Sequence, residues 1–165
     1  MSEHKATISW KCAGPDFLDG KYSREHTWMF DGGLTVPASP SPSIVPVPWS
    51  NPANVDPEEA FIAAISSCHM LTFLFLACQQ GFRVDGYRDE AVGVMTKNHQ
   101  GVPWVSSVVL HPQIAYGGDK LPGPADEARL HHLAHEQCFI ANSIKTEVTL
   151  AGTKDDAFSP GRRSG

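Results

Sequence analysis

The sequence has no excess of positive charge and no basic cluster outside its last residues. It contains 13 Lys and Arg against 18 Asp and Glu, which gives a net charge of −5. Its one run of adjacent Lys or Arg residues is Arg162-Arg163, close to the end. Proteins that bind nucleic acid or an anionic membrane surface usually present a basic patch. The composition therefore predicts neither nucleic acid nor a membrane as a partner.

A secretory signal is also missing from the first residues. Met1 to Lys11 carries Glu3, His4 and Lys5 and has no apolar run of the length found in a signal peptide. We therefore expect the protein to be cytoplasmic. The chain has 4 cysteines, and in a reducing compartment these are expected to be thiols rather than structural disulfides.

The segment from Ala60 to Gln80 lacks a polar face. Asp56-Pro57-Glu58-Glu59 precedes it and carries the signals of a helix start: an N-cap, a proline at the first position and acidic residues in the first turn. Gly81 provides a C-terminal stop. The pattern predicts one long helix whose large apolar side chains point in every direction around its axis.

A helix that is apolar all round is buried in a core or in a membrane. Ser66-Ser67-Cys68-His69 and Thr72 lie in its middle, where a bilayer makes polar groups costly. We interpret the segment as a core helix, with a transmembrane span as the alternative. A chain of 165 residues is small for covering such a helix, so a partner chain is expected to supply the missing cover.

Before this helix the sequence predicts β-structure and then a proline-rich loop. Ala6 to Trp10 and Tyr22 to Phe30 are expected to form an antiparallel hairpin. Leu34 to Asn54 contains six prolines, which exclude a helix and disfavour a central strand. This loop is interpreted either as a lid or pocket wall, or as a stiff or disordered connector.

After the helix the sequence predicts two β-rich segments, a second helix and a last strand: Val84 to Lys97, Val102 to Tyr116, Asp126 to Gln137 and Lys145 to Leu150. The turn Asn98 to Gly101 separates the two β-rich segments. The expected fold class is α+β, with one domain over residues 1–151. Residues 152–165 are expected to be a disordered tail.

Two of the cysteines are candidates for chemistry. Cys68 lies among hydroxyl side chains and His69, and Cys138 begins a new segment after a helix that is rich in histidine. A free thiol has a pKa near ~8.5, so a reactive cysteine needs a nearby cation or helix N-terminus. Arg24 is the one arginine before the main helix. Cys12 and Cys78 have no such surroundings and are interpreted as bystanders.

Two other functions are compatible with the residues. His131, His135 and Cys138 share one helix face and could bind zinc, with His132 or His69 as a fourth ligand. Alternatively, the cysteines are incidental and the protein is a non-enzymatic carrier of an apolar ligand. The cavity of such a carrier would be lined by Phe61, Phe73, Phe75 and Trp49.

The chain resembles the OsmC/Ohr family, the osmotically inducible protein C and organic hydroperoxide resistance proteins. Two motifs carry the resemblance. The first is Asp56-Pro57-Glu58-Glu59 with Cys68 ten positions after Glu58, and the second is Cys138 followed by Ile140-Ala141-Asn142-Ser143-Ile144-Lys145. The order of predicted elements over Ala6 to Leu150 is similar to that of the family. The resemblance implies a long central helix packed against antiparallel sheets in an intertwined homodimer.

The resemblance also implies an activity, a thiol peroxidase acting on organic hydroperoxides without a cofactor. Cys68 would attack the peroxide and become a sulfenic acid, and Cys138 would resolve it as a disulfide. A dithiol reductant, lipoyl-type in one branch of the family, would reopen the disulfide. A sulfenic acid condenses readily with a nearby thiol, which fits this order of events.

The resemblance further implies that Glu58 and Arg24 assist Cys68, with Glu58 orienting the arginine beside the thiolate. Glu58 and Cys68 are ten residues apart, or roughly 15 Å along one helix. They cannot share a site within one chain unless the helix breaks between them. We therefore expect Glu58 to come from the other subunit.

Overall fold

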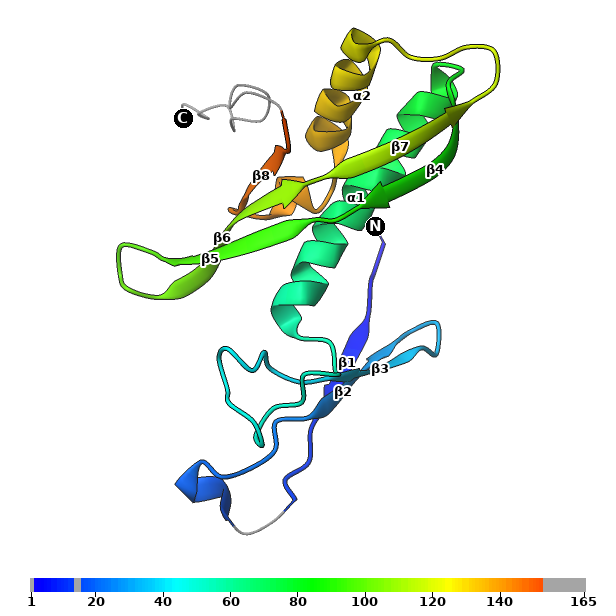
Figure 1. Ribbon diagram of the computed structural model, residues 1–165. Coiled ribbons are helices and arrows are strands. Elements are labelled where there is room, and N and C mark those ends of the chain that lie inside the picture. Colours follow the sequence, from blue (N-terminus) through cyan, green and yellow to red (C-terminus); the bar gives the residue numbers. More distant parts are fainter. Residues whose placement is uncertain (1, 14–15, 153–165) are drawn as a thin grey trace. The chain divides into compact units, whose positions relative to one another are not determined.

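The N-terminal unit is built on a small antiparallel sheet. The computed structural model describes residues 2–13 and 16–152, and the chain divides into two compact units, Met1–Ala60 and Phe61–Gly165. In the first unit β1 (Ala6–Ser9) pairs with β2 (His26–Phe30), and β2 pairs with β3 (Thr35–Ala38) (Figure 1). The predicted hairpin is present, with a short 3-10 helix, η1 (Asp16–Asp19), between its strands. Pro37 is tolerated because β3 is an edge strand.

The proline-rich loop is fastened to this sheet rather than left as a free linker. The backbone N–H of Ser39 donates to the carbonyl of Val55 at 3.0 Å, and the Ser39 hydroxyl accepts from the N–H of Asn51 at 2.8 Å. The Asn51 and Asn54 side chains both donate to Glu25. These contacts return the chain to the sheet just before the main helix begins.

The main helix, α1 (Pro57–Gln79), starts as the sequence predicts and is continuous. Asp56 accepts a hydrogen bond from the N–H of Glu59 at 2.7 Å, and the Glu59 carboxylate accepts one from the N–H of Asp56 at 3.2 Å. This reciprocal pair is a capping box. At the other end Gly81 has a φ of 75°, the left-handed conformation that ends a helix.

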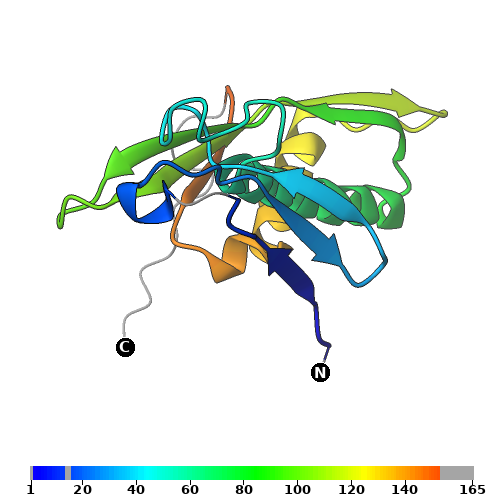
Figure 2. The ribbon, with the colours of Figure 1, turned by 90° about the horizontal axis from the view of Figure 1, so that it is seen from below.

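In the second unit the strands form a long bent ribbon, and α1 and α2 (Pro124–Gln137) lie on the same side of it (Figure 2). The sequence predicts two β-rich segments here, and each is divided into two strands. β4 (Arg83–Asp89) pairs with β7 (Pro112–Gly117), and β5 (Val92–Lys97) pairs with β6 (Pro103–Leu110). β8 (Glu147–Leu150) joins β6 in parallel after the short 3-10 helix η2 (Ala141–Ser143).

Asp89 lies at the bend between the two halves of the ribbon. Its carboxylate accepts hydrogen bonds from the Ser66 hydroxyl of α1 and from the backbone N–H of His111, the latter at 2.6 Å. Asp89 is the last residue of β4, and His111 separates β6 from β7. The carboxylate therefore fixes the bend to the middle of α1.

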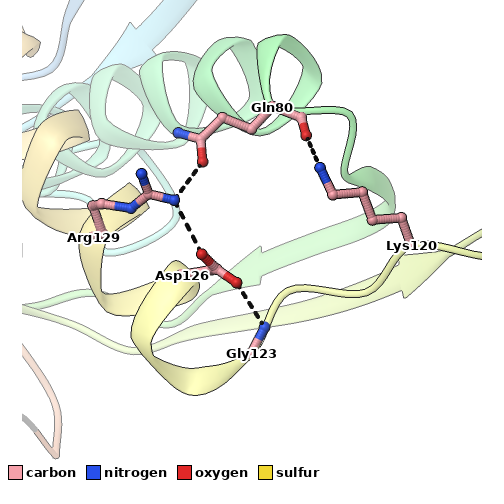
Figure 3. A network of polar contacts seen from close by, with 5 residues as sticks. All are labelled: Gln80, Lys120, Gly123, Asp126 and Arg129. Carbon is pink, nitrogen blue, oxygen red and sulfur yellow. Dashed lines mark hydrogen bonds and ion pairs between the residues drawn. The ribbon is translucent and has the colours of Figure 1, made fainter.

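Two apolar clusters form the core of the second unit. The first surrounds Ile65, and the second packs Phe73, Leu76 and Ala77 of α1 against Leu130 and Ala134 of α2. A polar network joins the C-terminal end of α1 to the N-terminal half of α2 (Figure 3). In this network Lys120 donates to the Gln80 carbonyl at 2.6 Å, and Arg129 bridges the Gln80 side chain and Asp126.

One face of α1 is core and another is exposed. His69 and Phe73 are buried, while Leu71 and Phe75 are 61% and 59% exposed. By length and composition α1 could also cross a membrane. Within the second unit, however, the Ser66 hydroxyl donates to Asp89 and His69 Nε2 pairs with His131, as expected for a core helix. The predictions of one domain for residues 1–151 and of a dimer stay predictions, and the predicted tail lies, from residue 153, outside the described residues.

Candidate active site

The structure brings together the two cysteines that the sequence singles out. Cys68 lies in the middle of α1, and Cys138 is the C-cap residue of α2. The two sulfur atoms are 2.7 Å apart, with the Cys138 thiol donating to the Cys68 sulfur. Both are free thiols, and a disulfide requires a sulfur separation of about 2.05 Å. Only a small movement therefore separates this dithiol from a disulfide.

The two thiols differ in exposure. Cys68 is half-buried, whereas Cys138 is 1% exposed. Burial raises the pKa of the Cys138 thiol to about 11, and the hydrogen bond to Cys68 acts in the same direction. The backbone N–H of Ala141 donates to the Cys138 sulfur at 3.4 Å. Cys138 is thus protonated at neutral pH, and Cys68 is the thiol that a dissolved reactant meets first.

Local hydrogen bonds hold the backbone at both cysteines. The Thr72 hydroxyl donates to the Cys68 carbonyl at 2.9 Å. The Asn142 side chain donates to the carbonyls of Glu136 and Cys138, at 2.8 and 2.9 Å. Asn142 therefore closes the end of α2, where Cys138 leaves the helix.

Next to the thiols lies a buried pair of histidines. His69 Nε2 and His131 Nδ1 are 3.0 Å apart, and the two rings are stacked with an interplanar angle of 8°. Among the described residues, the buried Nδ1 of His69 has no hydrogen-bond partner. If His69 accepted from His131, its own proton would sit on that Nδ1 as a buried, unsatisfied donor, which is costly. We therefore assign the Nε2 proton to His69, which donates to His131.

Acidification is expected to destabilise the fold through this pair. Burial, together with the neighbouring His131 and His135, lowers the pKa of His69 from 6.5 to about 3, and burial also lowers the pKa of His131. Between pH 6.5 and about 3, His69 binds a proton in the unfolded chain but not in the folded chain. The free energy of unfolding is therefore highest above pH 6.5, and it falls as the pH is lowered toward 3.

Urea unfolding between pH 7 and about 4 measures this effect. We expect the free energy of unfolding of the wild type to fall with acidification, and His69→Gln to reduce that pH slope. The matched control is His99→Gln, at an exposed position in a turn. Equal slopes in the wild type and His69→Gln would contradict the assignment of His69 as a buried neutral imidazole.

Arg24 and Glu58 belong to the first unit, so their predicted contact with Cys68 stays a prediction. Arg24 donates to the carbonyls of Tyr22 and Gly20, and its guanidinium lies 4.1 Å from the centre of the Tyr22 ring. Glu58 is half-buried in the first turn of α1. No hydrogen bond or ion pair joins Arg24 to Glu58 within the described residues.

An apolar pocket in the first unit was not predicted from the sequence. Trp10, Phe17 and Tyr22 contact one another with ring centres 4.7 to 5.8 Å apart. The pocket has a volume of about 490 Å³ and is lined by Ile8, Trp10, Phe17, Tyr22, Arg24, His26, Pro40 and Pro57. Pro40 belongs to the proline-rich loop, so part of that loop is a pocket wall. The signal in the sequence was the three aromatic residues within the predicted hairpin.

The zinc site considered from the sequence is not assembled. Over residues 2–13 and 16–152 no three His, Cys, Asp or Glu side chains are grouped so that they could hold a metal ion. His131 faces His69 and Phe73 instead, and Cys138 faces Cys68. A common helix face was therefore insufficient to predict a zinc site, because tertiary packing gives His131 and Cys138 different partners.

The four aromatic side chains of the predicted carrier cavity have different surroundings. Trp49 belongs to the first unit, whereas Phe61, Phe73 and Phe75 belong to the second. Phe73 is buried between the helices, Phe61 packs against the cluster around Ile65, and Phe75 is exposed. Because an α-helix turns about 100° per residue, phenylalanines at these positions face different surroundings. The pocket in the first unit contains none of them.

Two close thiols on packed helices, one half-exposed and one buried, define a dithiol site in an α+β protein. Residues 50–151 match the model of the OsmC-like protein family. The chain belongs to the OsmC-like family. The family resemblance predicted from the two cysteine motifs is therefore confirmed.

Solved structures show the same fold. The chain is 54% identical to an OsmC-like protein of unknown function from Vibrio cholerae, with a TM-score of 0.88 over 91% of this chain and 98% of that one. An organic hydroperoxide resistance protein OsmC from Legionella pneumophila is 15% identical, with a TM-score of 0.64 over 91% and 97%. An organic hydroperoxide resistance protein from Elizabethkingia anophelis is 19% identical, with a TM-score of 0.63 over 93% and 98%. No curated protein matches the sequence.

Proposed function

We propose that this protein is a two-cysteine thiol peroxidase that reduces organic hydroperoxides to alcohols. The observation that carries the proposal is the 2.7 Å separation of the Cys68 and Cys138 sulfurs, with Cys68 half-exposed and Cys138 buried. Membership of the OsmC-like family supports a redox role. The hydroperoxide substrate is supported by the names of fold relatives from Legionella pneumophila and Elizabethkingia anophelis.

In the first step the Cys68 thiolate attacks one oxygen of the peroxide and the O–O bond breaks. The alkoxide takes a proton and leaves as the alcohol, while Cys68 becomes a sulfenic acid. In the second step the Cys138 sulfur attacks the Cys68 sulfur. The S–O bond breaks, and the hydroxide leaves as water with the proton that Cys138 gives up.

The third step requires a reductant, which we propose is a dithiol such as a reduced lipoyl (dihydrolipoyl) group. One of its thiols attacks the Cys68–Cys138 disulfide, and the second releases the protein by forming its own disulfide. Both protein thiols are then reduced. Free thiols of this kind suit a reducing compartment, so we propose that the protein acts in the cytoplasm.

We propose that an organic hydroperoxide with an apolar substituent is a better substrate than hydrogen peroxide. α1 is apolar over most of its length, and the first unit contains the aromatic pocket that includes Arg24. Burying an apolar substituent is favourable by roughly 25 cal/mol for each Å² of surface removed from water. Hydrogen peroxide has no such substituent to bury.

We also propose a homodimer in which one subunit completes the site of the other. The exposed stripe of α1 that includes Leu71 and Phe75 is apolar, and it provides a surface that a second copy could cover. α1 is continuous, so the alternative of a helix break between Glu58 and Cys68 is removed. The proposal assigns Glu58 and Arg24 of one subunit to the Cys68 thiolate of the other.

Arg24→Ala and Glu58→Ala are expected to slow the alkylation of Cys68 at neutral pH by about tenfold or more, because the thiolate would lose its nearby cation. Peptide-resolved mass spectrometry separates Cys68 from the exposed Cys12 and Cys78. The matched control is Arg88→Ala, which removes an exposed arginine of β4 paired with Glu90. An unchanged alkylation rate in Arg24→Ala would mean that the activating cation lies elsewhere.

The proposed activity is tested by the consumption of cumene hydroperoxide and of hydrogen peroxide, with dihydrolipoamide as the reductant. We expect the organic peroxide to be consumed faster. A non-enzymatic carrier would consume neither peroxide, and its thiols would remain titratable.

A further inference from the structure

The interface between α1 and α2 is apolar apart from its histidine pair and its ends. Phe73, Leu76 and Ala77 of α1 pack against Leu130 and Ala134 of α2. Apolar contacts are non-directional, so they define the relative position of two helices less sharply than a hydrogen bond does. A hydrogen bond has a narrow range of distance and angle, so a buried polar pair within such an interface fixes the register.

The histidine pair lies close to the two thiols, where the position of α2 along α1 sets the distance between Cys68 and Cys138. His69 directly follows Cys68 on α1. His131 lies seven residues before Cys138, or about 10 Å along α2. The His131 ring also packs on Phe73, one turn after His69, with ring centres 4.4 Å apart. These contacts hold α2 against the turn of α1 that contains His69 and Phe73. They lie about two helical turns before Cys138 in α2.

The rate at which Cys138 forms the disulfide with Cys68 depends strongly on where α2 places Cys138. Cys138 must approach the Cys68 sulfur along the line of the bond that breaks, and a misplacement of about 1 Å can slow such a step by about 100-fold. In the structure the sulfurs are already 2.7 Å apart. The first step has no such requirement, because the peroxide diffuses to the half-exposed Cys68.

We propose that His69 and His131 are positioning residues for disulfide closure, and that their hydrogen bond holds α2 in the register that keeps Cys138 against Cys68. Neither imidazole exchanges a proton with the substrate in this role. The proposal rests on the two-cysteine function proposed above, but closure itself can be measured without a peroxide.

Dipyridyl disulfide separates the two thiol steps in the full-length protein. The Cys68 thiolate breaks the S–S bond of the reagent, which releases one thione and leaves a mixed disulfide on Cys68. The Cys138 thiol then loses its proton and its sulfur attacks the Cys68 sulfur, which releases a second thione and forms the protein disulfide. The exposed Cys12 and Cys78 are replaced by serine in every variant, so that only these two steps are recorded.

Two pairs of variants isolate the hydrogen bond. His131→Leu and His69→Met remove it while keeping apolar volume at each position. His131→Asn keeps an acceptor close to the place of Nδ1, and His69→Gln keeps a donor close to the place of Nε2. His132→Asn is the matched control, since His132 lies on the exposed face of the same helix and pairs with Glu136. Circular dichroism and thermal unfolding identify any variant that does not fold.

We expect the second thione to be released about tenfold or more slowly in His131→Leu and His69→Met, with the first release unchanged. His131→Asn, His69→Gln and His132→Asn should stay within about threefold of the wild type. The proposal is overturned if closure is unchanged in a folded His131→Leu or His69→Met. It is also overturned if the conservative variants close as slowly as the apolar ones. If closure follows the proposal but peroxide is not consumed, the peroxidase function fails and the positioning role stands.

Discussion

Cys68→Ser is expected to reduce peroxide consumption to the rate of the buffer alone. A serine hydroxyl has nearly the size of the thiol, but it does not ionise near neutral pH and forms no sulfenic acid. The measurement is the loss of cumene hydroperoxide under multiple-turnover conditions with dihydrolipoamide. Because a serine hydroxyl can still accept the hydrogen bond that the Cys138 thiol donates, thermal unfolding should change little.

Cys78→Ser is the matched control for this substitution. Cys78 lies on the same helix, ten residues after Cys68, and is exposed. Its replacement should leave the rate unchanged. Full activity in Cys68→Ser, or its loss in Cys78→Ser, would assign the peroxidatic thiol to another residue.

Cys138→Ser is expected to complete one turnover and then stop. The Cys68 thiolate can still reduce one peroxide, but its sulfenic acid then lacks the thiol that lies 2.7 Å away in the wild type. A second peroxide oxidises an unresolved sulfenic acid to sulfinic acid, which a dithiol does not reduce. Stopped-flow measurements should show a fast burst of about one equivalent of peroxide per chain and then slower loss of a second equivalent, and mass spectrometry should then show two added oxygen atoms on Cys68.

The control for this result is Cys12→Ser, which removes an exposed thiol from the first unit. It should retain multiple turnovers without oxygen addition at Cys68. Sustained turnover in Cys138→Ser would mean that the reductant resolves the sulfenic acid directly, and that Cys138 is not the resolving thiol.

Features governed by neighbouring residues could be predicted from the sequence. The start of α1 depends on Asp56 and Glu59, three positions apart, and the predicted boundary agrees with the capping hydrogen bonds. The turn at Asn98 to Gly101 is present between β5 and β6. The division of the two β-rich segments could not be predicted, because it depends on Asp89 reaching His111 and Ser66, 22 and 23 residues away.

The sequence predicted the partners of some site residues and not of others. Cys68 and Cys138 are 70 positions apart, and their pairing followed from the family resemblance rather than from spacing. In the structure the two sulfur atoms lie 2.7 Å apart, and their shared role in one redox site stays a prediction. His131 was interpreted as a possible metal ligand, because a helix face alone does not show which element will cover it. Its partner is His69, 62 positions away.

The claim that Cys68 and Cys138 form one redox pair is tested most directly by treating the reduced protein with one equivalent of cumene hydroperoxide. Intact mass and peptide mapping without reductant then identify the product. We predict that the chain becomes lighter by two hydrogen atoms and that the peptide containing Cys68 is linked to the peptide containing Cys138. Unconsumed peroxide with both thiols still open to alkylation after unfolding would contradict the claim.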